Sequence, residues 1–147
     1  MSDVFKKLNL KDQEEILILN APESFEPELA SLDDVVIRRS IDSIQRIVFS
    51  LAFVTRQTEV DDLARTIAQR AEGDAIVWFA YPKASSKNYN CEFNRDTGWA
   101  VLGELGFEGV RQVAIDADWS ALRFRRVEFI KTMSRAKQRR LTEQDKK

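Results

Sequence analysis

The loop from Tyr81 to Lys87 carries the side chains in this sequence that are best suited to holding a small ligand. It reads Tyr-Pro-Lys-Ala-Ser-Ser-Lys, so Lys83, Ser85, Ser86 and Lys87 follow one another closely. Ammonium groups and hydroxyls donate hydrogen bonds, and phosphate oxygens are strong acceptors of such bonds. The loop therefore indicates an anion site, although polar loops after strands are routine and a solvated loop without a ligand stays the plainer alternative.

A buried strand must position this loop. Residues 75–81 are all apolar or aromatic, which is typical of a central strand covered on both faces, and Pro82 cannot continue the ladder. Similar runs predict the remaining strands. They lie at 15–19, 34–39, 46–54, 110–115 and 121–127.

Helices are predicted between several of these strands. The spacing of apolar residues predicts a helix over 59–71, with Thr58 as its N-cap and Gly73 just beyond its end. A second helix is expected to start at Asn94 or Asp96 and to end before Gly106.

Strands and helices alternate, and this order predicts a three-layer α/β fold. We expect a mostly parallel, doubly wound sheet of strand order 2-1-3-4 that ends in an antiparallel hairpin. A single domain over residues 1–130 is predicted, followed by a basic, polar tail over 131–147 that is helical or frayed.

Ligands of such folds bind beyond the carboxyl ends of the strands, near the point where the strand order reverses. Lys83, Lys87 and Arg56 should make this crevice positive, and the helix expected near Asn94 should add backbone N–H donors. We therefore predict a site for a small anion or nucleotide. Its candidate residues are Asn20, Glu23, Thr55, Arg56, Tyr81, Lys83, Ser85, Ser86, Lys87, Asn94 and Trp119.

The composition restricts the chemistry. The chain has 147 residues, a net charge of −1, no histidine and one cysteine, Cys91. Histidine is the commonest general base and metal ligand, so we expect no metal site and lean against catalysis. A disulfide within the chain is excluded, and no apolar run reaches the ~20 residues of a membrane span. These features, with no visible signal peptide, predict a cytoplasmic protein without a membrane partner.

Two other features have plainer interpretations that we favour. Asp116, Asp118, Trp119 and Ser120 could form an acidic pair beside an aromatic platform, but Asp and Ser also favour turns through local hydrogen bonds. Basic residues in the tail could contact nucleic acid, but nearby acidic residues dilute that charge, so no nucleic-acid partner is expected.

Three segments resemble the hallmarks of an uncharacterised bacterial family of small, Rossmann-like α/β proteins, a family of unknown function. They are 18–23 (ILNAPE), 77–83 (VWFAYPK) and 118–124 (DWSALRF). Ser85-Ser86-Lys87 and Asn94-Arg95-Asp96 also fit the pattern, and the likeness covers roughly residues 8–130. It implies the fold but no activity.

The order of elements also resembles, more weakly, the fold of S-adenosylmethionine-dependent methyltransferases. The resemblance implies a cofactor at a glycine-rich turn after the first strand. Here that turn reads Asn20-Ala21-Pro22-Glu23 and has no glycine. The backbone cannot easily approach a nucleoside there, so neither S-adenosylmethionine nor NAD is expected.

Three functions stay open from the sequence. The first is a non-catalytic binding or regulatory module for a small anion or nucleotide. The second is a transferase-type enzyme on a degenerate methyltransferase-like scaffold, and the third is a protein-interaction subunit.

Overall fold

The structure, a computed structural model, describes residues 2–94 and 96–132. Its main elements are α1 (Asp3–Lys7), β1 (Glu15–Leu19), α2 (Glu26–Ala30), β2 (Val36–Arg38), β3 (Ile47–Phe53), α3 (Gln57–Arg70), β4 (Ala71–Pro82), α4 (Ala100–Glu104), β5 (Phe107–Ala114) and β6 (Trp119–Arg126). Short 3₁₀ helices lie at Glu23–Phe25, Ile41–Ser43 and Val127–Thr132. From residue 133 onward the predicted tail lies outside the described residues.

Six strands form one sheet in the order β2-β1-β3-β4-β6-β5. The first four run parallel, and β6 runs antiparallel to both β4 and β5. The predicted strand order and the terminal hairpin are therefore confirmed. The chain leaves β1 toward β2 and leaves β3 toward β4, so the order reverses between β1 and β3, which is where such sheets form a crevice.

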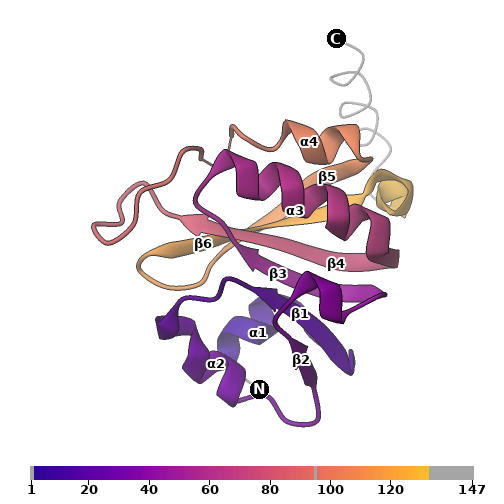
Figure 1. The fold of residues 1–147 in the computed structure, drawn as a ribbon, viewed down its shortest axis with the longest axis horizontal. Coiled ribbons are helices and arrows are strands. Elements are labelled where there is room, and N and C mark those ends of the chain that lie inside the picture. The colour runs from indigo at the N-terminus through magenta and orange to yellow at the C-terminus, as the bar shows by residue number, and fades with distance from the viewer. Residues whose placement is uncertain (1, 95, 133–147) are drawn as a thin grey trace.

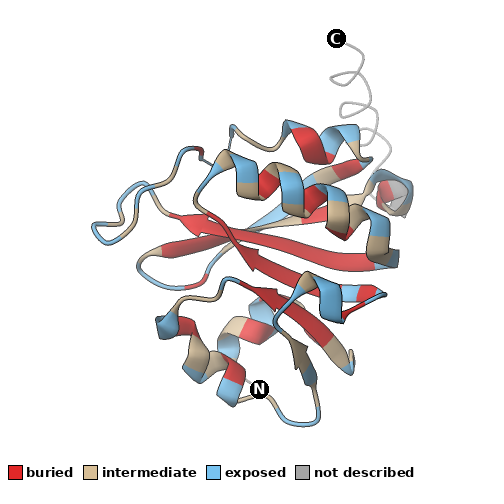
Figure 2. Ribbon diagram, in the orientation of Figure 1, coloured by how far each residue is buried: buried red, intermediate tan, exposed pale blue. Residues whose placement is uncertain are grey.

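Helices cover both faces of the sheet and complete three layers (Figure 1). Successive residues of β4 point to opposite faces, so Val77 and Phe79 pack on the side of α3 while Trp78 and Ala80 pack on the side of α1. All four are completely buried, as the red strands of Figure 2 show. Burial on both faces explains why residues 75–81 of β4 are apolar without alternation.

The helix α3 starts and ends earlier than its sequence pattern predicts. It starts at Gln57 because the carboxylate of Glu59 reaches back to the backbone N–H of Arg56, at 3.0 Å, and of Thr55, at 2.9 Å. Arg56, not Thr58, is therefore the N-cap residue. Gly73 has the positive φ expected of a residue that ends a helix, 57°, but it lies inside β4, where the ladder with β3 is irregular.

The helix predicted from Asn94 or Asp96 is wrong in its start. The side-chain oxygen of Asn94 accepts the backbone N–H of Asp96 at 2.8 Å and of Thr97 at 3.1 Å, which forms a turn in place of a helix cap. The helix α4 begins only at Ala100. Among the described residues, no helix is long and apolar enough to cross a membrane.

Candidate ligand-binding site

The strands β1, β3 and β4 end side by side, as the predicted crevice requires. The side-chain amide of Asn20, after β1, donates to the carbonyl oxygen of Phe53 in β3 at 3.3 Å. The backbone N–H of Val54 donates to the carbonyl oxygen of Ala80 in β4 at 2.8 Å. Three segments that are distant in sequence thus share one edge of the sheet.

The loop after β4 is fastened at both ends by carboxylates. At its start, Asp118 accepts the hydroxyl of Ser86 at 2.8 Å and the amide of Asn88 at 3.2 Å. At its end, the carboxylate of Glu92 accepts the backbone N–H of Gln57, the first residue of α3, at 2.8 Å. The loop therefore runs across the sheet edge from the β6 side to the start of α3.

Two cavities lie at this edge in place of one continuous crevice. One, the lysine cavity, has a volume of about 350 Å³, and the other, the tryptophan cavity, about 370 Å³. Tyr81, Lys83, Ser86, Tyr89, Asn90 and Asn94 line the lysine cavity. Asn20, Glu23, Phe53, Thr55, Tyr89 and Trp119 line the tryptophan cavity. Tyr89 is the residue that both linings share.

The lysine cavity has the chemistry of an anion site. Lys83 is its one charged lining residue among those described, and no carboxylate lines it. The amides of Asn90 and Asn94 add polar groups. Four predicted residues therefore meet here, as Tyr81, Ser86 and Asn94 join Lys83.

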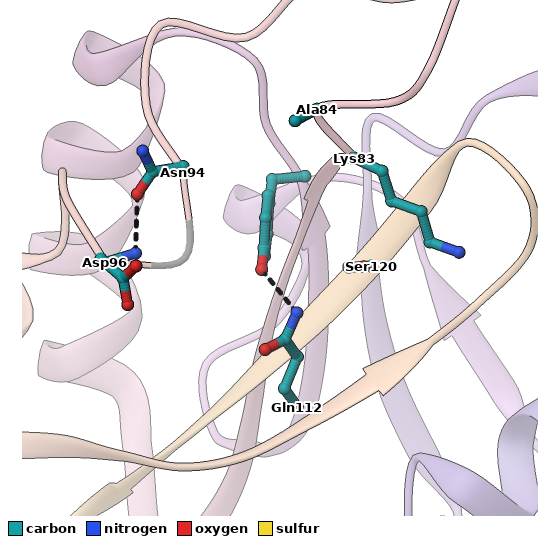
Figure 3. A pocket seen from close by; sticks show the side chains of 7 residues that line it. Lys83, Ala84, Asn94, Asp96, Gln112 and Ser120 are labelled. Atoms are coloured by element: carbon teal, nitrogen blue, oxygen red, sulfur yellow. Dashed lines mark hydrogen bonds between the residues drawn. The ribbon is translucent and has the colours of Figure 1, made fainter.

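A smaller cavity of about 270 Å³ adjoins the lysine cavity and shares Tyr81, Lys83 and Asn94 with it (Figure 3). Here the side-chain amide of Gln112 donates to the hydroxyl of Tyr81 at 3.0 Å, which fixes the tyrosine against β5. Lys83 extends away from Asn94 and Asp96, as Figure 3 shows. Its ammonium group is thus directed away from that carboxylate.

The tryptophan cavity differs in charge and in filling. Its described lining has no cation, and it includes the carboxylates of Glu23 and Glu59. Trp119 is only 4% exposed. Its ring packs edge-on against Phe53 at 5.1 Å and at a tilt against Tyr89 at 4.8 Å, measured between ring centres. Such a cavity does not favour an anion, although four predicted residues line it, namely Asn20, Glu23, Thr55 and Trp119.

Three predicted residues line none of these cavities. Arg56, Ser85 and Lys87 are exposed; Arg56 is the N-cap residue of α3, and the other two belong to the loop after β4. The expected contribution of a helix N-terminus near Asn94 is also wrong, since α4 begins at Ala100. Positive charge in the cavities described here therefore comes from Lys83 and not from a cluster.

Residues 116–118 form a turn that leads into β6 at Trp119, as the plainer interpretation predicted. One side-chain oxygen of Asp116 accepts the backbone N–H of both Asp118 and Trp119, each at 2.8 Å. The turn delivers Trp119 to the core and Asp118 to the loop after β4.

Cys91 also lines the lysine cavity, but it is a poor nucleophile. Burial raises the pKa of its thiol, and the charges of Glu92 and Glu59 act in the same direction. The group therefore stays protonated at neutral pH, whereas a catalytic cysteine needs its thiolate.

Tyr89 and Gln112 belong to the cavities but were missed from the sequence. Tyr89 is the one aromatic residue in the polar run 83–92, which is a usable signal. Gln112 gave no comparable signal, because a polar residue in an edge strand is ordinary. Its role depends on reaching Tyr81 across β6.

Comparisons with known proteins show the fold. A protein of Bordetella parapertussis described as a possible exported protein matches with a TM-score of 0.56 at 11% identity, over 84% of this chain and 65% of that one. A SAM-dependent methyltransferase from Aquifex aeolicus matches with a TM-score of 0.55 at 12% identity, over 83% and 87%. The fibrillarin pre-rRNA processing protein of Methanococcus jannaschii matches with a TM-score of 0.51 at 11% identity, over 78% and 67%.

The chain thus has the Rossmann-like fold of methyltransferases, as the weaker resemblance implied. No protein-family model matches the sequence, and no curated protein matches it. Membership in the small α/β family suggested by its three segments stays a prediction.

Proposed function

We propose that this protein is a non-catalytic module that binds a small anion, such as phosphate or the phosphate of a nucleotide, in the lysine cavity. The observation that carries the proposal is the lining itself, in which Lys83 is charged and no carboxylate opposes it. The volume of about 350 Å³ falls in the range of roughly 300–1,000 Å³ that is usual for ligand pockets.

Three of the acidic side chains at this edge have structural roles, which supports a role without catalysis. Glu59, Glu92 and Asp118 all accept hydrogen bonds, mostly from backbone N–H groups or loop side chains, and thereby hold the loop and the start of α3. A general base must be able to take up a proton from a substrate. These carboxylates act instead as structural acceptors, and the chain has no histidine to replace them.

The residues where a nucleoside cofactor would bind support the same proposal. The turn Asn20-Ala21-Pro22 follows β1 without a glycine, although Asn20 takes the left-handed φ of 58° that glycine favours. Dinucleotide sites use a carboxylate on the ribose, about 20 residues after that turn. Here β2 ends at Arg38, which pairs with Glu15, and the next residue, Arg39, pairs with Glu26.

The three segments that resemble a family of unknown function lie at the same edge of the sheet. These segments, 18–23, 77–83 and 118–124, contain the ends of β1 and β4 and the start of β6. Strand pairing brings the last two together, and β1 reaches the same edge through Asn20 and Phe53. A shared binding edge would account for all three.

A transferase-type enzyme is the second candidate. The tryptophan cavity favours it, because this space of about 370 Å³ lies at the switch point of a methyltransferase-like fold. Against it stand the turn without glycine and the burial of Trp119 within the cavity wall.

A thermal-shift screen with phosphate, nucleotides and S-adenosylmethionine separates these functions. The proposal expects phosphate and phosphorylated ligands to raise the melting temperature of the protein, and Lys83→Ala to abolish that rise. A rise with S-adenosylmethionine that survives Lys83→Ala would support the transferase instead. No rise with any ligand would support a protein-interaction subunit.

A further inference from the structure

Tyr89 is the wall between the two cavities. It is half-buried, comes from the middle of the loop after β4, and lines both spaces. The loop holds it in place through the backbone N–H of Tyr89, which donates to the hydroxyl oxygen of Ser86 at 3.2 Å. A ligand that extends from one cavity toward the other must therefore pass along the tyrosine ring.

One lining residue of the tryptophan cavity, Trp119, carries an unused hydrogen-bond donor. Trp119 is only 4% exposed, and its buried indole N–H has no acceptor among the described residues. The other two tryptophans differ, since Trp78 donates to the carbonyl oxygen of Leu8 and Trp99 to that of Asn94, each at 2.8 Å. Buried donors without acceptors cost free energy, and a bound ligand or water is one way to supply the acceptor.

The two cavities are also close along the chain trace. Pro82 lies opposite Trp119 in the ladder between β4 and β6, and the next residue, Lys83, donates its backbone N–H to the carbonyl oxygen of Asp118 at 2.7 Å. Lys83, which lines the lysine cavity, and Trp119, which lines the tryptophan cavity, are thus neighbours at the end of the ladder between β4 and β6.

From this arrangement we infer that the ligand is a phosphate monoester carrying a heteroaromatic ring, the chemistry of a nucleoside monophosphate. The phosphate lies in the lysine cavity beside Lys83, and the ring lies against Tyr89 with an acceptor atom toward the indole N–H of Trp119. This inference rests on the proposed anion site and adds the second half of the ligand to it.

The charges of the cavities fix this orientation. The ring is neutral and suits the tryptophan cavity, where Glu23 and Glu59 would repel a phosphate. Tyrosine rings stack on any nucleobase, because every base has an aromatic face. In the lysine cavity the ligand is held by the attraction between its phosphate and Lys83. In the tryptophan cavity it is held by stacking on Tyr89 and by one hydrogen bond from Trp119.

Adenosine monophosphate and ribose 5-phosphate form a matched pair of probes, because they differ in the base alone. We expect the full chain to bind adenosine monophosphate at least about tenfold more tightly than ribose 5-phosphate, measured by calorimetry. Tyr89→Leu should remove that difference, because leucine has no aromatic face on which the base can stack.

The three indole N–H signals in a ¹H–¹⁵N spectrum give a second readout. The Trp119 signal, assigned by its loss in Trp119→Phe, should move on addition of adenosine monophosphate and not on addition of ribose 5-phosphate. The Trp78 signal, whose N–H is already bound to Leu8, is the internal control and should stay in place.

Equal affinity for the two probes, or a Trp119 signal that does not respond to adenosine monophosphate, would overturn this inference while the anion site stands. If neither probe binds, or if Lys83→Ala leaves the binding of both unchanged, the anion site fails as well and the inference fails with it.

Discussion

The backbone N–H of Lys83 donates to the carbonyl oxygen of Asp118 at 2.7 Å, and this bond joins the loop after β4 to the turn before β6. Asp118 also receives the hydroxyl of Ser86. One residue therefore fixes both the backbone that carries the lysine and the loop that closes its cavity. The predictions below start from this loop.

Asp118→Ala should loosen the loop without unfolding the sheet. The hydroxyl of Ser86 would lose the carboxylate to which it donates. The backbone N–H groups of Asn88 and Tyr89, which donate to the oxygen of that hydroxyl, would then be held less firmly. We expect their hydrogen exchange to speed up roughly fivefold, as the loss of about 1 kcal/mol implies. Ser85→Ala, at an exposed neighbouring position, is the control, and equal exchange in both variants would contradict the role of Asp118.

Glu59→Ala should lower the free energy of unfolding by about 1–2 kcal/mol, because the backbone N–H groups of Thr55 and Arg56 would lose their acceptor. Urea denaturation measures the change. The matched control in the same helix is Asp62→Ala, whose carboxylate is 81% exposed and 3.8 Å from Arg65, and which should change stability by less than about 0.5 kcal/mol. Similar losses in both variants would show that Glu59 is not a cap.

Asn20→Ala should destabilise the protein by about 1–2 kcal/mol, since alanine tolerates a φ of 58° poorly and cannot donate to Phe53. Asn20→Gly should cost less than Asn20→Ala, because glycine adopts this φ without strain. A lower melting temperature for Asn20→Gly than for Asn20→Ala would contradict this account, because it would show that the positive φ at position 20 does not limit which residue is tolerated there.

Alkylation of Cys91 should be slow at neutral pH and should accelerate only at a pH above that for a free thiol. The reason is that burial raises the pKa of this thiol, so the folded protein holds the proton more tightly than the unfolded chain. The stability that this proton contributes is accordingly present at neutral pH and is lost as the pH rises through the folded pKa. Mass spectrometry against a denatured sample checks the rate, and equal pH profiles would contradict the raised pKa.

The fold was largely predictable because its strands are long apolar runs. Residues 75–81 are buried on both faces and are all apolar or aromatic, and 46–54 are mostly apolar, with Ser50 as the one polar residue inside the strand. Such runs locate the central strands in the sequence. The strands β5 and β6 form the predicted antiparallel hairpin, with β5 at the edge of the sheet.

The helix expected at Asn94 failed because the same residue type favours both caps and turns, and the contacts of its side chain decide between them. Here its oxygen closes a turn with Asp96 and Thr97. Similarly, Gly73 ends a helix by its pattern but belongs to an irregular part of β4.

The position of the candidate site was predicted from the sequence, but its division into two cavities was not. Eight of the eleven candidate residues line one of the two cavities, because strand ends can be located from the sequence. The division between the cavities could not be predicted. It depends on Tyr89, whose backbone N–H donates to the hydroxyl oxygen of Ser86. That hydroxyl in turn donates to Asp118, which is 32 residues away in the sequence.

A phosphate titration of two lysine variants, followed by NMR shifts of the backbone amides, tests the central claim most directly. Lys83→Ala should weaken phosphate binding at least about tenfold, because a charge-assisted hydrogen bond is lost from the cavity. Lys87→Ala removes the same charge from the same loop but from an exposed residue outside the cavities, and it should bind phosphate as the unaltered protein does. If both variants bind phosphate equally weakly, binding depends only on the net charge of the loop, and this result would contradict a site at Lys83.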